Sequence, residues 1–344
     1  MRSTTDSAVT LVVPVRDEEA WIPRLAAMIE AQTRAPDAVI FVDGGSRDTT
    51  VTRLSSACRA HPNWRVVEAG PATPGRGRNV GIGAASTEWV ALTDAGVDID
   101  AHWLERLASA AAASAADADL DVVWGDYEMA PDTRFASVAQ YAHHAPRLTT
   151  SRGPVRNPFV ASCMVRRSAW ERAGGFPDLR AAEDGIFVRR LTENGARAGL
   201  APEAFVRWHP PATAGETFRR FRTFSRVNAA AGEQRRWHYG VARMYAVASP
   251  IVLLTLFRRR WVALLLAAPL ARSARTLQRH RDGRGVLWVL NPARLVGLTF
   301  AHLLIDAATF LGWADASRPS RSWRRNERDP HISAPRTVGE DGPR

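Results

Sequence analysis

Lysine is absent from this sequence of 344 residues, so all 46 of its lysine-or-arginine positions are arginines. The formal net charge is +11. Arginine's planar guanidinium makes bidentate contacts with phosphates that lysine does not make. An all-arginine positive charge therefore fits a surface that meets nucleotide phosphates, acidic lipid headgroups or nucleic acid. A coding preference for arginine and alanine explains it equally well, and charge alone does not decide between the two.

Cysteine is also scarce, since only Cys58 and Cys163 occur and no Cys-x-x-Cys spacing is present. This excludes a cysteine zinc site and a disulfide framework, and it favours a reducing compartment. A signal-peptide pattern is lacking as well. Met1 to Ala8 is polar, and the short apolar run Val9 to Val15 is followed at once by charges, which is typical of a first strand. We expect the catalytic part to stay in the cytoplasm.

What is present is an alternation of short β-rich runs with helical ones from Val9 to about Trp208. Continuous apolar strands between helices are typical of a parallel sheet covered on both faces. The sequence thus predicts an α/β fold with a doubly wound, mostly parallel sheet, in which ligands bind at the carboxyl ends of the strands. Strands are expected at 11–14, 38–42, 64–68, 89–93 and 121–123, and helices at 19–32, 48–61, 77–86 and 186–194.

Beyond this α/β domain, expected over residues 1–215, three further segments are predicted. Residues 216–243 read as a basic amphipathic connecting helix, which either packs on the domain or lies on an anionic surface. Residues 244–315 contain two apolar stretches that are interrupted by Arg258, Arg259, Arg260 and other polar residues. These are either soluble core helices or helices at the cytoplasmic face of a membrane, and we favour the membrane. Residues 316–344 are expected to be a disordered tail.

Three loops with acidic or small residues follow directly after expected strands. They are Pro14 to Glu18, Asp43 to Thr50, and Asp94-Ala95-Gly96. Each loop alone is explained by a turn and a helix cap. Three such loops, each after a strand, are better explained by a polar site for a nucleotide, because the carboxyl ends of parallel strands meet at one edge of the sheet.

A glycine-rich segment, Pro74 to Gly81, lies between the second and third loops. Its glycines free the backbone, and its two arginines, Arg76 and Arg78, stand at the start of an expected helix whose N-terminus also favours anions. Either arginine is a candidate phosphate contact. The segment is not a P-loop, because the Gly-Lys-Ser/Thr ending is missing.

In their order along residues 9–210, these landmarks resemble family 2 glycosyltransferases. The matching segments are Pro14 to Glu18, Asp43-Gly44-Gly45-Ser46, Arg78-Asn79, Asp94-Ala95-Gly96, and Gly174-Gly175-Phe176 followed by Glu183-Asp184. The resemblance implies a GT-A fold and a nucleotide diphosphate sugar as donor. It implies donor contacts from Pro14, Arg16, Glu18, Asp43, Gly45, Arg76, Arg78, Asn79, Asp94 and Ala95. It also implies catalytic residues Asp184 and Glu183, and a divalent metal, Mg²⁺ or Mn²⁺, held by Asp94 and His209.

One position departs from that family pattern. Gly96 stands where a second aspartate is most common, so a metal would lose its most direct carboxylate ligand. Asp94 and His209 could suffice, since Mg²⁺ and Mn²⁺ keep waters and take phosphate oxygens. Asp98 could reach inward instead, or Arg76, Arg78 or the basic helix near Arg219 could balance part of the charge.

Asp184 is the expected base. In a transfer with inversion, an acceptor hydroxyl attacks the anomeric carbon and the diphosphate leaves on the opposite side, so one carboxylate must take the hydroxyl proton. An aspartate here could also be only a helix cap. The acceptor is expected to be lipid-linked or a cell-envelope glycan, at the cytoplasmic face of the membrane.

Two rival functions remain at this point. Gly96 favours a sugar-nucleotide-binding partner subunit with impaired catalysis, whereas the Glu183-Asp184 pair argues against it. A nucleotidyltransferase would need a glycine-rich basic loop after the first strand, where this chain has the acidic Asp17-Glu18. Nucleic-acid binding is not expected, because no known module is present.

Overall fold

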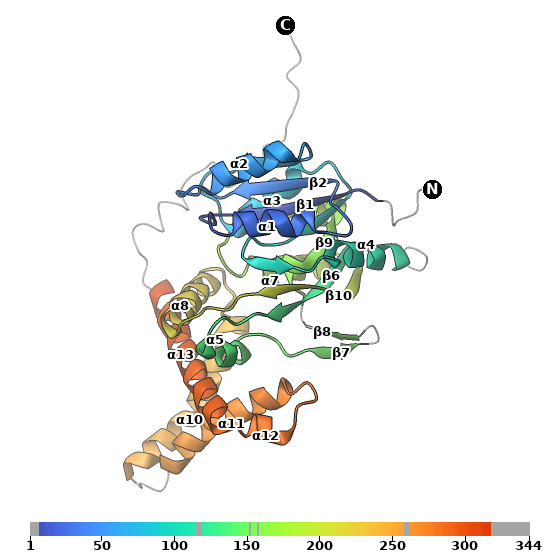
Figure 1. The fold of residues 1–344 in the computed structure, drawn as a ribbon. Coiled ribbons are helices and arrows are strands. Elements are labelled where there is room, and N and C mark those ends of the chain that lie inside the picture. The colour runs from blue at the N-terminus through green and yellow to red at the C-terminus, as the bar shows by residue number, and fades with distance from the viewer. Residues whose placement is uncertain (1–6, 115–118, 151–152, 157, 258–261, 318–344) are drawn as a thin grey trace.

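The computed structural model describes residues 7–114, 119–150, 153–156, 158–257 and 262–317. Its α/β domain lies above a group of C-terminal helices in the view of Figure 1. Arg258 to Arg260 lie outside the described residues. So does the expected disordered tail, from residue 318 onward.

The domain is built on an eight-stranded sheet in the order β3-β2-β1-β4-β9-β6-β10-β5. The neighbours from β3 to β4 are parallel, as are β6 and β10, whereas β9 and β5 run antiparallel to their neighbours. The expected parallel arrangement is therefore confirmed for the N-terminal half, and the whole sheet is mixed. The strands are β1 Val9–Val15, β2 Ala38–Asp43, β3 Trp64–Glu68, β4 Trp89–Leu92, β5 Val97–Ile99, β6 Val122–Met129, β9 Cys163–Arg166 and β10 Ala198–Trp208. A separate antiparallel hairpin pairs β7 Leu148–Thr150 with β8 Gly153–Val155.

Helices cover both faces of the sheet, which gives two hydrophobic cores. In β1, Leu11 and Val13 join the core beneath α1, α2 and α4, whereas Val12 joins the core beneath α3, α6 and α7. Both faces of the strand are buried, which explains its uninterrupted apolar sequence. These helices are α1 Ile22–Glu30, α2 Thr50–Ala60, α3 Pro74–Ala84, α4 Trp103–Ser114, α6 Arg167–Arg172 and α7 Glu183–Glu193. Short elements between them are α5 Arg134–Ala139, η2 Gln140–Ala142 and η3 Val160–Ser162.

The basic segment after the domain is not one helix, so the expectation for 216–243 was wrong. A capping box of Thr213 and Glu216 starts α8 at Ala214, and the helix ends at Ala230. Gly232, at φ 79°, then turns the chain. A left-handed residue of this kind ends a helix because its backbone cannot continue the right-handed spiral. The following helices are α9 Gln234–Trp237, α10 Tyr239–Phe257, α11 Val262–Arg279, α12 Val286–Val289 and α13 Pro292–Ala316.

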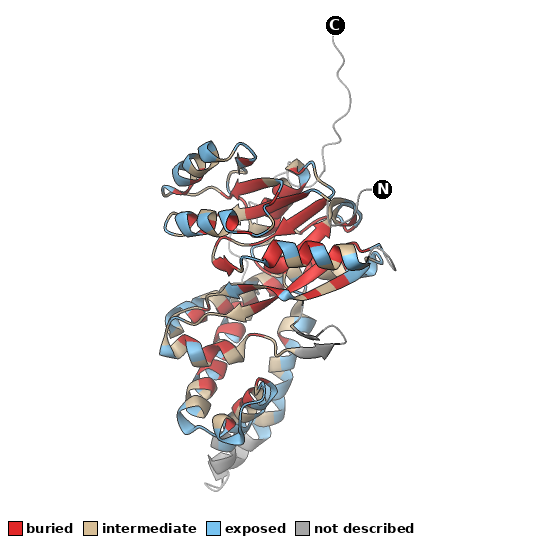
Figure 2. Cartoon of the chain, turned by 45° about the vertical axis from the view of Figure 1, so that its right-hand side comes forward, coloured by how far each residue is buried: buried red, intermediate tan, exposed pale blue. Residues whose placement is uncertain are grey.

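Helix α8 is fixed to α13 by close packing and by polar contacts. A Cβ on Gly312 would lie 2.3 Å from the carbonyl oxygen of Arg222, so only glycine permits this approach. Ser225 Oγ donates to the carbonyl of Thr309 at 2.6 Å, and Arg222 pairs with Asp315 at 2.6 Å. In Figure 2 the strands of the sheet are mostly buried, whereas the C-terminal helices show long exposed faces.

Among the described residues, α13 is the one helix whose length and composition suit a membrane span, with a mean hydropathy of 1.7 over its best window. That window is 39% buried inside the protein. The helix also carries Asp306, which is 2% exposed and paired with Arg272 of α11 at 2.5 Å. Such internal contacts are typical of core helices as well, so α13 alone is weak evidence for a membrane.

Candidate active site

A cleft of about 1060 Å³ opens at the carboxyl ends of β1, β2 and β4, as the sequence predicted. Its walls come from the loops after these strands, the start of α3, the start of α7, the end of β10 and one face of α8. The charged residues that line it are Arg16, Asp17, Glu18, Arg78, Asp94, Arg180, Glu183, Asp184, His209, Arg219 and Arg220.

One guanidinium holds three carboxylates together in this cleft. Arg78 lies 2.8 Å from Asp94 through Nη2, and its Nη1 lies 2.8 Å from Asp184 and 3.2 Å from Glu183. The Arg78 side chain is only 2% exposed. The cluster joins the turn after β4 to the start of α7, and it leaves more negative than positive charge facing the cleft. Arg78 is thus committed to carboxylates, whereas the sequence offered it as a phosphate contact.

Asp184 and Glu183 differ in access to the cleft. The side chain of Asp184 is 41% exposed and that of Glu183 is 9% exposed. Helix α7 begins at Glu183, and its cap position is Ala182, at φ 69° and without a side-chain cap. Asp184 therefore does not act as the helix cap, which was the structural alternative. Of the two carboxylates, it is the one that a substrate could reach.

The pKa of both acidic groups lies above the usual carboxylate range. Burial raises the pKa of Glu183 to about 7, with a further contribution from the charge of Asp184 and an opposing one from Arg78. Burial also raises the pKa of Asp184, again against the attraction of Arg78. Because the two groups interact, they titrate as a pair. Raised carboxylate pKa values are common at catalytic sites.

The turn after β4 supplies one carboxylate to the cleft. Asp94 is 39% exposed, and Ala95 and Gly96 line the cleft beside it. A Cβ placed on Gly96 would meet no atom within 4 Å. The glycine is therefore not required by packing, and an acidic side chain would have room there.

His209, expected as a metal ligand, has both ring nitrogens engaged. Nε2 lies 3.1 Å from Asp98 and Nδ1 lies 3.0 Å from Asp132. Asp98 Oδ2 also accepts from Arg24 at 2.6 Å, whereas its buried Oδ1 has no hydrogen-bond partner among the described residues. The described parts of the chain contain no group of three His, Cys, Asp or Glu side chains arranged to hold a metal ion. These residues do not fit a metal that the protein binds by itself.

Several expected donor contacts lie behind the cleft and shape its loops. Asp43 is buried and accepts from the backbone N–H of Gly45 and Ser46 and from the Ser46 hydroxyl. Asn79 accepts from Trp170 and from the N–H of Phe176, which fixes the Gly175–Phe176 turn against α3. Arg76 is exposed and does not line the cleft.

The loop after β1 lines the cleft with Pro14, Arg16 and Glu18. The N–H of Glu18 donates to the Thr50 hydroxyl, and that of Asp17 donates to Ser46, so this loop is tied to the loop after β2. Burial, together with the charges of Asp48, Asp94 and Asp17, raises the pKa of Glu18.

Sequence reasoning missed part of the cleft. Phe159, Trp208 and Phe224 line it, whereas Trp124 and Tyr127 are buried in the two cores. Arg180 and Arg220 also line it. The interleaved phenylalanines and arginines of α8 were a signal of an amphipathic helix, but their spacing alone does not indicate which arginine faces inward.

An α/β domain with a polar cleft at its strand ends is typical of proteins that bind a ligand, often a nucleotide, at that edge of the sheet. The sequence profile of "Glycosyl transferase family 2" matches residues 10–173, just under half of the chain. This segment is therefore similar to that family. Its expected GT-A fold is confirmed.

Two curated proteins are similar to this chain in sequence, and one solved structure is similar to it in fold. The chain is 30% identical over 210 residues to "Pre-mycofactocin glycosyltransferase" from two strains of Mycobacterium tuberculosis. That match covers 58% of this chain but only 42% of these relatives. The fold is similar to that of the mannosyltransferase PcManGT from Pyrobaculum calidifontis, solved in complex with GDP-Man and Mn²⁺. The TM-score is 0.54, with 20% identity and coverage of 90% of this chain and 88% of that one.

Proposed function

We propose that this chain transfers a sugar from a nucleotide diphosphate sugar to an acceptor hydroxyl, by single displacement with inversion. The observation that carries the proposal is the pairing of Asp94 and Asp184 in one cleft through Arg78. This arrangement holds Asp94, in the expected donor loop, at a fixed separation from Asp184, the expected base. The nucleotide sugar bound to PcManGT supports a donor of the same chemical class.

Asp184 acts as the general base in this proposal. Its exposed carboxylate can accept the acceptor's proton, and a pKa above the usual range improves the match between base and hydroxyl at neutral pH. Arg78 orients the carboxylate from behind and limits how far the pKa rises. Glu183, buried beside it and paired with the same guanidinium, is a positioning residue.

The loops after β1 and β2 hold the nucleoside. The buried Asp43 keeps Gly44 and Gly45 in a tight turn, and Gly44 lines the cleft beside Pro14 and Val15. A flat base can approach such a turn closely because it carries no side chain. Glu18 and Arg16 then supply polar contacts at the rim.

A divalent ion would reach this cleft with the donor, and Asp94 would be its protein ligand. The Mn²⁺ of the PcManGT complex supports an ion at the diphosphate. Mg²⁺ and Mn²⁺ accept phosphate oxygens and waters as most of their ligands, so one carboxylate is an adequate protein contribution. Such an ion supplies positive charge to the leaving diphosphate.

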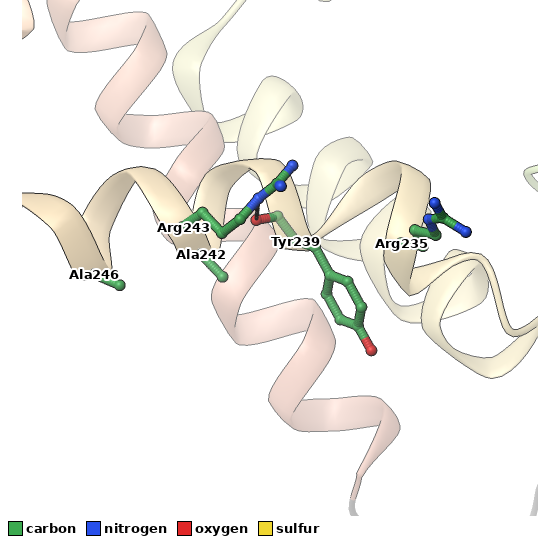
Figure 3. Close-up of a pocket in the computed structure, with 5 residues that line it drawn as sticks. All are labelled: Arg235, Tyr239, Ala242, Arg243 and Ala246. Atoms are coloured by element: carbon green, nitrogen blue, oxygen red, sulfur yellow. Dashed lines mark hydrogen bonds between the residues drawn. The ribbon is translucent and has the colours of Figure 1, made fainter.

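The C-terminal helices are proposed to lie on the cytoplasmic face of a membrane, where the acceptor is a lipid-linked or cell-envelope glycan. Within the described part of the chain, the exposed large hydrophobic side chains lie on these helices, from Tyr239 to Leu311. A surface hollow of about 540 Å³ is lined by Arg235, Tyr239 and Arg243. In Figure 3, Arg235 and Arg243 lie on either side of Tyr239. Arginines beside exposed apolar side chains are typical of helices at anionic headgroups.

Gly96 favours a second candidate, a sugar-nucleotide-binding subunit with impaired catalysis. One experiment separates the two functions. The purified protein is screened for thermal stabilisation by a panel of nucleotide diphosphate sugars, with and without Mn²⁺, and each binder is then tested for slow donor hydrolysis. We expect stabilisation and hydrolysis by the same donor, because a bound ligand raises native stability. Stabilisation without hydrolysis supports the binding subunit. If neither stabilisation nor hydrolysis is observed, both proposed functions are contradicted.

A further inference from the structure

Helix α8 contributes two arginines to the lining of the cleft that contains the carboxylate cluster. Arg219, Arg220, Thr223 and Phe224 of this helix line the same cleft as Asp94 and Asp184. Arg220 is held between two aromatic rings, with its Cζ 5.0 Å from the centroid of Trp208 and 5.9 Å from that of Phe224. Stacking of this kind uses the faces of the planar guanidinium and leaves its edge N–H donors available.

Arg220 differs in its partners from two other arginines, Arg78 of the cleft and Arg222 of the same helix. Arg78 is committed to three carboxylates, and Arg222, on the same helix, is paired with Asp315. Arg220 has no hydrogen bond or ion pair with the residues that the structure describes, apart from its two ring contacts. A half-buried cation that is oriented by stacking, with unused donors in a cleft, has the features of an anion contact.

The electrostatics place this cation within reach of the reacting centre. Burial lowers the pKa of Arg220, and the charges of Asp94 and Glu216 oppose this effect. The group stays protonated, because an arginine is not deprotonated in proteins. Of these two carboxylates, Asp94 has the larger effect on the pKa of Arg220. Asp94 and Arg220 line the same cleft, so the cation is exposed to the space in which the donor's phosphates are proposed to lie.

Several other groups that could balance a diphosphate are engaged or lie elsewhere, which leaves Arg180 and Arg219 beside Arg220 among the arginines of the cleft lining. Gly96 provides no carboxylate for a metal, His209 is engaged on both nitrogens, and Arg76 lies outside the cleft. Arg16 lies 3.6 Å from Asp17, which already offsets its charge. The leaving group of the reaction nevertheless gains negative charge as the sugar departs, and that charge requires a positive partner.

We propose that Arg220, assisted by Arg219, binds the diphosphate of the donor and supplies positive charge to it as it leaves. This inference rests on the proposed function. It assigns to α8 the charge balance that a second carboxylate and its metal would provide in the family pattern. Arg220 is thereby a donor-binding residue outside the segment that matches the family profile.

The test measures binding of UDP, GDP and the matching nucleosides by calorimetry in EDTA, for the wild-type chain, Arg220→Met and Arg226→Met. Arg226 is an exposed arginine of the same helix outside the cleft lining, and it serves as the matched control. We expect Arg220→Met to weaken binding of the preferred diphosphate at least tenfold while its nucleoside binds as before, because a charge-assisted contact is lost. Arg226→Met should match the wild type, and Arg220→Lys should be intermediate.

Two outcomes with Arg220→Met overturn the inference and leave the proposed function standing. One is diphosphate binding by Arg220→Met equal to that of the wild type in EDTA. The other is an equal loss of nucleoside and diphosphate binding, which would show that Arg220 only supports the cleft wall. If the wild-type chain binds nucleoside diphosphate only when Mn²⁺ is added, the inference fails and the proposed function stands; if it binds none with or without Mn²⁺, the proposed function itself fails.

Discussion

Arg78 and Asp184 form an ion pair of 2.8 Å in which the cation is 2% exposed and the anion is 41% exposed. The carboxylate is therefore held on its inner side by a buried charge and is open on its outer side to the cleft. The same guanidinium reaches Asp94. A base and a donor-loop carboxylate with a common buried partner keep their separation when the surrounding loops move.

Asp184→Asn should leave donor binding close to that of the wild type and lower kcat by about a hundredfold to ten-thousandfold, the usual contribution of a general base. The amide keeps the shape of the side chain but cannot take the acceptor's proton. Donor affinity from calorimetry and turnover with a saturating acceptor are the two measurements. Glu193→Gln, at the exposed end of the same helix, is the control. Turnover near the wild-type value in Asp184→Asn would remove Asp184 from the mechanism.

Arg78→Met should destabilise the fold by about 3–5 kcal/mol, because it leaves clustered carboxylates without their buried partner. The exposed Arg76, two residues earlier in α3, is the matched control. Arg76→Met should change the free energy of unfolding by no more than about 0.5 kcal/mol and should leave donor affinity unchanged. Urea unfolding followed by circular dichroism measures both variants. Equal stability of the two would contradict the assigned position of Arg78.

The free energy of unfolding should depend on pH partly through the titration of Glu183. Its pKa is about 7 in the folded chain and has the ordinary glutamate value in the unfolded one, so the folded state binds more protons between these values. The stabilising contribution is complete below the ordinary pKa and is lost as the pH rises through about 7. Glu183→Gln should flatten this part of the profile and gain relative stability at pH 8. Parallel profiles for the two proteins would show that Glu183 is ionised throughout.

Gly96→Asp should strengthen Mn²⁺-dependent binding of the nucleoside diphosphate, on the order of tenfold, because ion affinity rises with the number of carboxylate ligands. The open space around Gly96 accommodates the side chain. Gly96→Ala adds bulk without charge and serves as the control. Calorimetry with and without Mn²⁺ measures the effect. A gain that is equal in EDTA would point to a contact with the nucleotide instead of the ion.

Replacing Leu287 and Leu290 together by aspartate should weaken binding to anionic vesicles more than tenfold. These side chains are 85% and 54% exposed around α12, and each leucine buried in a membrane contributes about 2 kcal/mol. Arg284 and Arg294 lie over Trp288 between them, within 4.6 Å and 4.5 Å of the ring centroid, and place positive charge beside the apolar side chains. The control replaces both leucines by valine. Co-sedimentation with vesicles that contain the anionic lipid phosphatidylglycerol measures binding. Unchanged binding of the aspartate variant would place the membrane contact elsewhere.

Local patterns were sufficient to predict the domain and the loops of the cleft. The apolar run of β1 and the acidic turn after β4 each contain their own signal, so the strand ends and the positions of Asp43 and Asp94 follow from neighbouring residues. The partners of Arg78 cannot be predicted from neighbouring residues. Glu183 and Asp184 lie 105 and 106 residues further along the chain, and their pairing with Arg78 depends on how α7 packs beneath the sheet. Likewise, the inward face of α8 is set by its contact with α13, which the local sequence does not specify.

Helix α8 belongs to two environments at once. On one side it presents Arg220 to the cleft, and on the other it is bound to α13 through Gly312, Ser225 and Asp315. Any force that displaces α13 also displaces the cation that faces the donor. If the C-terminal helices attach to a bilayer as proposed and α13 shifts when they do, attachment and occupancy of the cleft are thermodynamically linked, and each then alters the affinity of the other by the same factor. A donor titration at fixed lipid and a lipid titration at fixed donor should give a single coupling constant.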